Sequence, residues 1–175
     1  MNLNKKSLSN LLNIKQTNNQ HNQGNKIMQR NCALALGVIF LLLGIAGFIP
    51  NFISLPSETF DSGIPLDADG IYAKGFGFLF GAFPTNFIHN LVHVSVGLLG
   101  IVAASTGNAR LYNRAFGVSY ILIAVMGLIP LTQTTFGIMP IFGNNVWLNA
   151  LSGTIAAYYG FLGTNPEVKT DRINA

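Results

Sequence analysis

The chain has 175 residues, of which 50% are hydrophobic and only 9% are charged. Soluble domains carry roughly 25% charged residues, so this composition predicts an integral membrane protein. The formal net charge of +4 does not indicate a nucleic-acid partner, because the cations are scattered through the tails and one short loop without interleaved aromatic residues.

The N-terminal region is polar. Residues 1–29 contain twelve Asn or Gln residues, with Lys5, Lys6, Lys15 and Lys26, and they lack a long apolar periodicity. This composition predicts a disordered cytoplasmic tail. Met28 is an alternative to Met1 as the first translated residue.

The first predicted membrane span covers residues 32–50, a run without a charged residue. Its length is close to the roughly 20 residues that cross a hydrocarbon core. It is longer than a signal-peptide core and has no following cleavage pattern, so we expect it to remain attached. The single cysteine, Cys32, excludes an internal disulfide, and we expect it to be buried at the end of this helix.

Residues 51–79 form the longest predicted connection and contain four acidic residues. We interpret this segment as an acidic extracytoplasmic insertion. Its apolar part, residues 75–80, is too short and glycine-rich for a span, which favours an interfacial or re-entrant segment.

Three further spans are predicted at residues 87–104, 115–131 and 146–162, with a basic turn at 105–114 and a tail at 164–175. The four-span domain then covers residues 30–163. Most Lys and Arg residues near the spans fall on one side, with Lys74 opposite, which predicts cytoplasmic termini. The expected location is the inner membrane of a bacterium, or a thylakoid membrane in a photosynthetic one.

The sequence contains an internal repeat. A shift of 80 residues aligns residues 35–50 with 115–130, and both segments end in Gly-x-Ile-Pro. A shift of 56 residues aligns Phe80-Gly81-x-x-Pro84 with the same pattern at residues 136–140. We therefore predict an all-α four-helix transmembrane bundle built from a tandem two-helix repeat, its halves related by a pseudo-twofold axis along the membrane normal.

The candidate functional residues are polar side chains near the starts of the second and fourth spans. The repeat aligns His89 with Asn145 and His93 with Asn149, and each pair lies one helical turn apart. Asn90 follows the first histidine. Because polar groups inside a membrane are costly, they indicate a functional site by default. We expect these groups to converge in the outer third of the bundle.

Three interpretations of this cluster remain open. The histidines and asparagines can hydrogen-bond across the helix interface, they can bind a small ligand or lipid headgroup, or His89 and His93 can hold haem or a divalent metal. A metal site would need a third ligand, and Asp61, Asp67 and Asp69 in the insertion are the carboxylates that could supply one. The sequence contains no catalytic motif that would indicate an enzyme. The predicted spans contain no charged residue, which argues against an ion-coupled transporter.

Three blocks of the sequence carry a family resemblance. They are the Gly-Phe-Ile-Pro ending at residues 47–50, the Asn86-x-x-His-Asn-Leu-Val-His93 block, and Gly127-Leu-Ile-Pro130. Over residues 28–163 the chain resembles the family of domain of unknown function 4383, uncharacterised bacterial four-span membrane proteins. The resemblance implies a four-helix membrane domain and no catalytic activity. The family pattern has a histidine where this chain has Asn149, which removes a third imidazole.

The sequence thus predicts a non-enzymatic membrane accessory protein that binds no cofactor. Its expected partners are the lipid bilayer and either other membrane proteins or further copies of itself. The alternatives are a small redox protein that binds haem or metal through His89 and His93, and a permease for small solutes.

Overall fold

The fold is described from a computed structural model, which defines residues 5–57, 61 and 70–161. It contains four helices, α1 (Lys5–Ala46), α2 (Phe87–Thr106), α3 (Ala109–Gly127) and α4 (Asn144–Phe161). A short 3-10 helix, Pro50–Phe52, and a small sheet follow α1. The predicted tail at residues 164–175 lies outside the described residues, as do Asp67 and Asp69.

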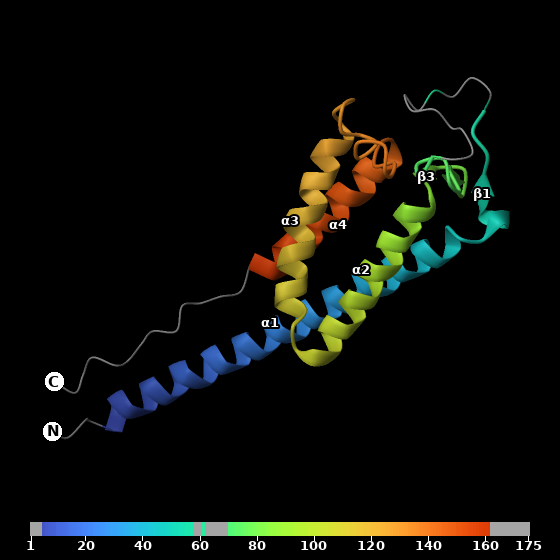
Figure 1. Cartoon of the computed structure of the whole chain (residues 1–175). Helices are drawn as coiled ribbons and strands as arrows, with labels where there is room; N and C mark the ends of the chain where they lie inside the picture. The colour runs from blue at the N-terminus through green and yellow to red at the C-terminus, as the bar shows by residue number, and fades with distance from the viewer. Residues whose placement is uncertain (1–4, 58–60, 62–69, 162–175) are drawn as a thin grey trace.

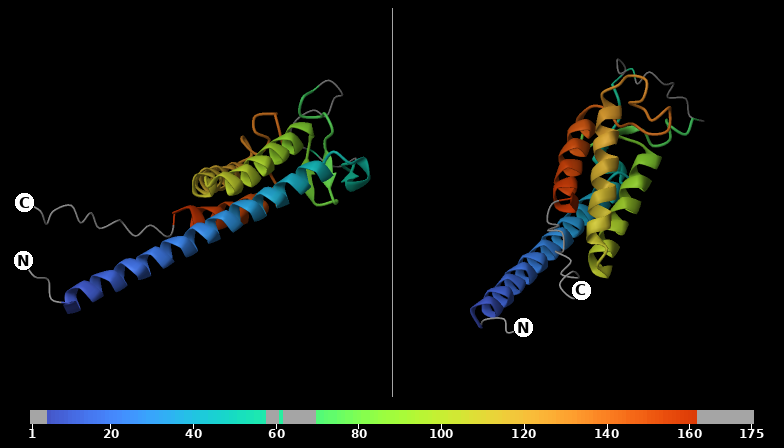
Figure 2. Two further views of the ribbon diagram at one scale, coloured as in Figure 1. Left: turned by 90° about the horizontal axis from the view of Figure 1, so that it is seen from below. Right: turned by 90° about the vertical axis from the view of Figure 1, so that its left-hand side faces the viewer.

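Helix α1 is much longer than the predicted span and extends beyond the other helices at its N-terminal end (Figures 1 and 2). The prediction of a disordered tail over residues 1–29 is therefore wrong from Lys5 onward. Lys, Leu and Gln are good helix formers, and adding a residue to an existing helix costs far less than starting one. Composition alone missed this continuation. For the same reason Cys32 is buried, as predicted, but lies inside α1 rather than at its end.

The helices pack as two pairs, α1 with α2 and α3 with α4. Glycines allow the backbones of each pair to approach closely. A Cβ atom built on Gly37 of α1 would lie 2.8 Å from the backbone nitrogen of Ile101, and one on Gly117 of α3 would lie 2.6 Å from that of Ala157. No larger side chain fits at either position unless the helices move apart.

Aromatic rings fill the space between the two pairs. Phe40 of α1 is fully buried and lies 5.1 Å from Phe116 and 5.0 Å from Tyr120 of α3, measured between ring centroids. Both contacts are edge-to-face, an arrangement that aromatic quadrupoles favour. Helices α1 and α3 therefore meet at the centre of the bundle.

The connection between α1 and α2 contains a three-stranded antiparallel sheet of β1 (Ile53–Ser54), β2 (Gly77–Leu79) and β3 (Phe83–Thr85). Residues 75–80 were predicted as an interfacial or re-entrant segment, whereas residues 77–79 form the central strand. The hairpin turn explains the difference. Phe80 and Gly81 both adopt positive φ, at 53° and 69°, which reverses the chain and pairs β2 with β3.

The predicted basic turn at residues 105–114 is also shorter in the structure. Helix α3 begins at Ala109, so Arg110 and Arg114 lie in its first turns. Arginine is compatible with a helix, and here both guanidinium groups donate to the carbonyl oxygen of Gly160, Nε of Arg114 at 2.8 Å and Nε of Arg110 at 3.4 Å. Both arginines thus lie beside the last turn of α4.

Apart from the central aromatic rings, the bundle places mainly small and polar residues inside and many large apolar residues outside. On α2 the buried residues include Gly97, Gly100, Ala103 and Ala104, whereas Leu98 and Leu99 are at least half exposed. Helices α1 and α2 are each long and apolar enough to cross a membrane. Among the described residues no other helix meets that criterion.

A buried histidine and asparagine cluster

The first turn of α2 is fixed by Asn86. This residue caps the helix, because its Oδ1 accepts a hydrogen bond from the backbone N–H of His89 at 2.9 Å. Its Nδ2 donates to the carbonyl oxygens of Tyr72, at 3.1 Å, and Ile138, at 2.8 Å. One fully buried side chain therefore joins α2 to the loops that precede α2 and α4, and it orients His89.

His89 and His93 lie one turn apart on α2, and both are buried. Nδ1 of His89 is 2.7 Å from the carbonyl oxygen of Pro140, and the two Nε2 atoms are 3.0 Å apart. A carbonyl oxygen can only accept, so Nδ1 of His89 carries the hydrogen of that bond. In the neutral ring Nε2 of His89 then accepts from Nε2–H of His93. Both imidazoles are thereby held in one tautomer and one orientation.

Asn145 of α4 makes a matching contact from the other pair of helices. Its Nδ2 donates to the carbonyl oxygen of Pro84 at 2.7 Å and to that of Pro140 at 3.2 Å. His89 thus reaches from α2 to a proline carbonyl before α4, while Asn145 reaches from α4 to a proline carbonyl before α2. The two contacts tie the helix pairs together in both directions.

The remaining candidates lie apart from this contact. Asn90 faces α1, where its Nδ2 donates to the carbonyl oxygen of Gly47 at 2.6 Å and its Oδ1 accepts from Thr85 Oγ1 at 2.5 Å. Asn149 is buried one turn after Asn145 on α4. The five candidates are therefore all buried near the same end of the bundle, and His89 and His93 are joined directly by a hydrogen bond.

A cavity of about 10 Å³ is lined by His89, His93 and Asn145, among other residues. That volume admits about one water molecule and no larger group. Within the described part of the chain, no three His, Cys, Asp or Glu side chains come close enough to hold a metal ion. His89, His93 and Asn145 thus belong to a packed hydrogen-bond network that leaves little free volume between them.

A family comparison bears on this arrangement. The model of the family described as Domain of unknown function (DUF4383) matches residues 30–162. The chain belongs to this family. The match covers the four packed helices and the cluster and leaves out the N-terminal part of α1, so the DUF4383 domain is the bundle itself. No curated protein and no solved structure matches the chain.

Sequence analysis of this DUF4383 protein missed several members of the network. Asn86 stands directly before an apolar helix, where Asn is a preferred capping residue, so its role could have been inferred. Pro84 and Pro140 were noticed as repeated residues, but only the fold reveals that their carbonyl oxygens accept hydrogen bonds. Thr85 gave no signal in the sequence.

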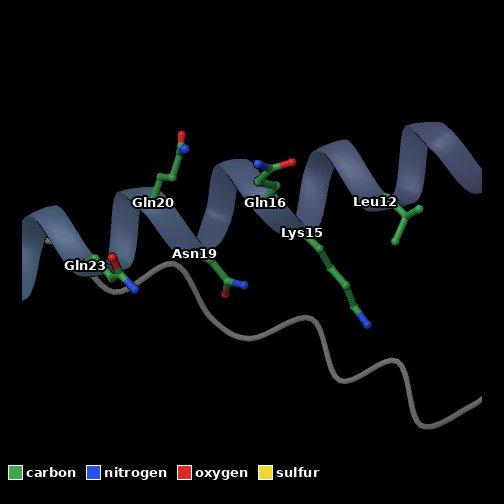
Figure 3. Close-up of a pocket in the computed structure, with 6 residues that line it drawn as sticks. All are labelled: Leu12, Lys15, Gln16, Asn19, Gln20 and Gln23. Atoms are coloured by element: carbon green, nitrogen blue, oxygen red, sulfur yellow. The ribbon is translucent and has the colours of Figure 1, made fainter.

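A second hollow lies on the projecting part of α1 (Figure 3). The side chains that line it come from one face of this helix: Leu12, Lys15, Gln16, Asn19, Gln20 and Gln23. All six are exposed. A hollow that one exposed helix lines has no opposing wall among the described residues, and it supports no binding site.

Proposed function

We propose that this protein is a four-span membrane protein that acts without catalysis, as an accessory or interaction protein, and that its His/Asn cluster locks two duplicated helix pairs together. The observation that carries the proposal is the distribution of side chains. The buried polar groups bond to one another and to loop carbonyls, whereas many large apolar side chains point outward on all four helices. Such a surface suits lipid and the helices of other membrane proteins.

Equivalent contacts in the two halves support a tandem repeat. A Cβ on Gly97 would lie too close to the backbone nitrogen of Leu41, and a Cβ on Gly153 would lie 2.9 Å from that of Ile121. These residues correspond under shifts of 56 and 80. Under the 56-residue shift His89 corresponds to Asn145 and Pro84 corresponds to Pro140. Each side chain contacts the proline of the other half, as expected when a pseudo-twofold axis relates the halves.

The backbone and the central rings support the same interpretation. Phe80 and Phe136 correspond under the 56-residue shift, and both adopt positive φ, at 53° and 55°. Phe40 and Tyr120 correspond under the 80-residue shift and touch each other. A contact between equivalent residues is expected where two copies meet at the axis.

We propose that α3 and α4 also cross the membrane, although they are less apolar than α1 and α2. The arginines of α3 lie in its first turns and lower the average hydropathy of the helix, but at a helix end their charges can reach the interface. Most of the remaining outward residues are apolar, among them Val118 and Leu122 on α3 and Leu151 on α4, all at least 48% exposed.

Charge supports an orientation with both termini in the cytoplasm. Arg114 contacts the last turn of α4, and the Nδ2 group of Asn113 beside it donates to the carbonyl oxygen of Gln29, the neighbour of Arg30. These cations therefore lie at one end of the bundle, whereas Lys74 lies at the other, above Phe87 of α2. The positive-inside rule then assigns the arginine end to the cytoplasm.

The same geometry favours an interaction protein over a redox protein. Both ring nitrogens of His89 are engaged, and the adjoining cavity is far smaller than a haem group. A metal ion at Nε2 of His89 would displace the bond to His93. We therefore propose that the protein carries neither group. A Soret band, or one metal ion per chain in the detergent-purified protein, would contradict this.

Topology can be tested with single cysteines in a Cys32→Ala background. Leu55→Cys and Leu131→Cys place thiols at exposed positions in two interhelical connections, and Thr106→Cys places one at the exposed last residue of α2. We expect a membrane-impermeant maleimide to label Leu55→Cys and Leu131→Cys in intact spheroplasts, and Thr106→Cys only after lysis. If α1 and α2 alone crossed the membrane, Leu131→Cys would also require lysis.

The interaction role can be tested by photo-crosslinking in native membranes. A diazirine amino acid at Leu151 or Val118, which face outward, is expected to give discrete crosslinked protein bands. The same group at Ala156, which is fully buried, is the matched control and should give none. Crosslinks to lipid alone at every outward position would leave the chain without a protein partner and would refute the interaction role.

A further inference from the structure

Another cavity, of about 530 Å³, lies at the end of the bundle opposite Arg110 and Arg114. One wall comes from the end of α1 and the residues after it, Gly47, Phe48 and Pro50. The other comes from the start of α2, Phe87 and Asn90. Its volume falls within the roughly 300–1,000 Å³ that small-molecule sites occupy. It is much larger than the cavity beside the histidines.

The described part of the long insertion in the first half lines this cavity. Ile53 and Leu55 line it from one side of the insertion, and Lys74, Gly75 and Phe76 line it from the other. The second half has no equivalent insertion, because only residues 128–143 connect α3 to α4. This cavity therefore lies where the two halves differ most.

Hydrogen bonds hold the floor and the rim in place. On the floor, Asn90 Nδ2 bridges to the carbonyl oxygen of Gly47 at 2.6 Å, joining α2 to α1. At the rim, the carbonyl oxygen of Lys74 accepts from the backbone N–H of Phe87 at 2.9 Å, joining the insertion to the first residue of α2. The position of residue 74 is thus fixed by its backbone, although its side chain is exposed.

The lining of the cavity combines apolar walls with one positive charge. Most of the described lining residues are apolar or aromatic, and Lys74 is the single charged residue among them. Its Nζ atom lies 5.3 Å from the centroid of the Phe87 ring. An ammonium group therefore stands at the mouth of an apolar cavity that opens near one end of the helices. Tyr72, which precedes Lys74 in the insertion, is buried and stacks on the lining residue Phe76, with 5.2 Å between ring centroids.

We propose that this cavity binds a single-chain anionic amphiphile, with the acyl chain against Phe48, Phe76 and Phe87 and the anionic head on Lys74 Nζ. A carboxylate or a phosphate can accept a charge-assisted hydrogen bond from an ammonium group. The apolar walls contribute by removing the chain from water. The proposal uses α1, α2 and the insertion only, so it stands whether or not α3 and α4 cross the membrane.

Direct binding tests the proposal. Radiolabelled palmitate is titrated into the full chain in mild detergent, and lysophosphatidic acid and hexadecanol serve as competitors. We expect saturable binding of palmitate, about one per chain, and weaker competition by hexadecanol, which lacks the charge. Lys74→Gln should weaken palmitate binding by about tenfold, since one charge-assisted bond is lost. Tighter competition by lysophosphatidic acid than by unlabelled palmitate would identify a phosphate head, and the reverse a carboxylate.

Three variants make the outcome specific. Lys74→Arg keeps the positive charge and should retain palmitate binding. Leu55→Glu should weaken binding, because it adds a carboxylate at an 83% exposed lining position. Lys15→Gln removes a positive charge far from the cavity and should leave palmitate binding unchanged. Equal palmitate affinity in the wild type and Lys74→Gln would overturn the proposal. So would equal competition by hexadecanol and unlabelled palmitate.

Discussion

Replacing Gly97 with leucine is expected to separate α1 from α2 and to lower the free energy of unfolding by about 3 kcal/mol or more, because overpacking a close contact forces the backbones apart. A Cβ on Gly97 would lie 2.7 Å from the carbonyl oxygen of Gly37 and closer still to the backbone nitrogen of Leu41. These are backbone atoms, which cannot rotate away. Reversible unfolding in mixed micelles measures the effect.

Gly24→Leu is the matched control for this prediction. Gly24 lies within α1, and a Cβ there would meet nothing within 4 Å. Leucine is the better helix former by roughly 0.5–1 kcal/mol, so this variant should be neutral or slightly more stable. If Gly97→Leu unfolded at the same denaturant concentration as the wild type, the close α1–α2 contact would be wrong.

Replacing Asn145 with leucine is expected to lower the free energy of unfolding by about 2 kcal/mol. The variant loses both Nδ2 hydrogen bonds, to Pro84 and to Pro140, and buried hydrogen bonds within membranes contribute about 0.6–2 kcal/mol each. Because the bond to Pro84 connects the two helix pairs, we also expect α3 and α4 to be released from α1 and α2 at lower denaturant. Limited proteolysis of the loop around Leu131 would report that release.

The adjacent residue supplies the control. Asn144 also donates from Nδ2 to a loop carbonyl oxygen, that of Ala82 at 3.1 Å, but this bond is exposed to solvent. Asn144→Leu should therefore cost no more than about 0.5 kcal/mol. Equal losses in the two variants would mean that burial of the Asn145 bonds adds nothing and that the cluster does not hold the halves together.

The ends of the helices could not be predicted from residue composition alone. The apolar runs predicted the positions of the four helices, and α2 begins at the predicted Phe87. Charged and polar residues were assigned to tails and turns, yet Arg110 lies within α3 and Lys15 within α1. Their side chains can reach solvent from a helix, so polarity did not end either helix.

The cluster could be predicted in part. The spacing of His89 and His93 and the alignment of His89 with Asn145 predicted these polar residues from the sequence, and all three are buried. Their partners could not be predicted, because the carbonyl oxygens of Pro84 and Pro140 carry no signature in the side chains. A backbone acceptor becomes specific only when a fold leaves it facing the donor.

The sequence by itself determined that this chain forms apolar helices of membrane-spanning length, that polar residues recur at aligned positions, and that glycines recur on the helices, since each is a property of local composition and spacing. Only the tertiary structure decided that His89 and Asn145 each contact the loop that precedes the other's helix. It also decided that the insertion lines a cavity beside Lys74. Both depend on atoms more than 20 residues apart meeting in space. Packing sets such distances, and no local pattern encodes them.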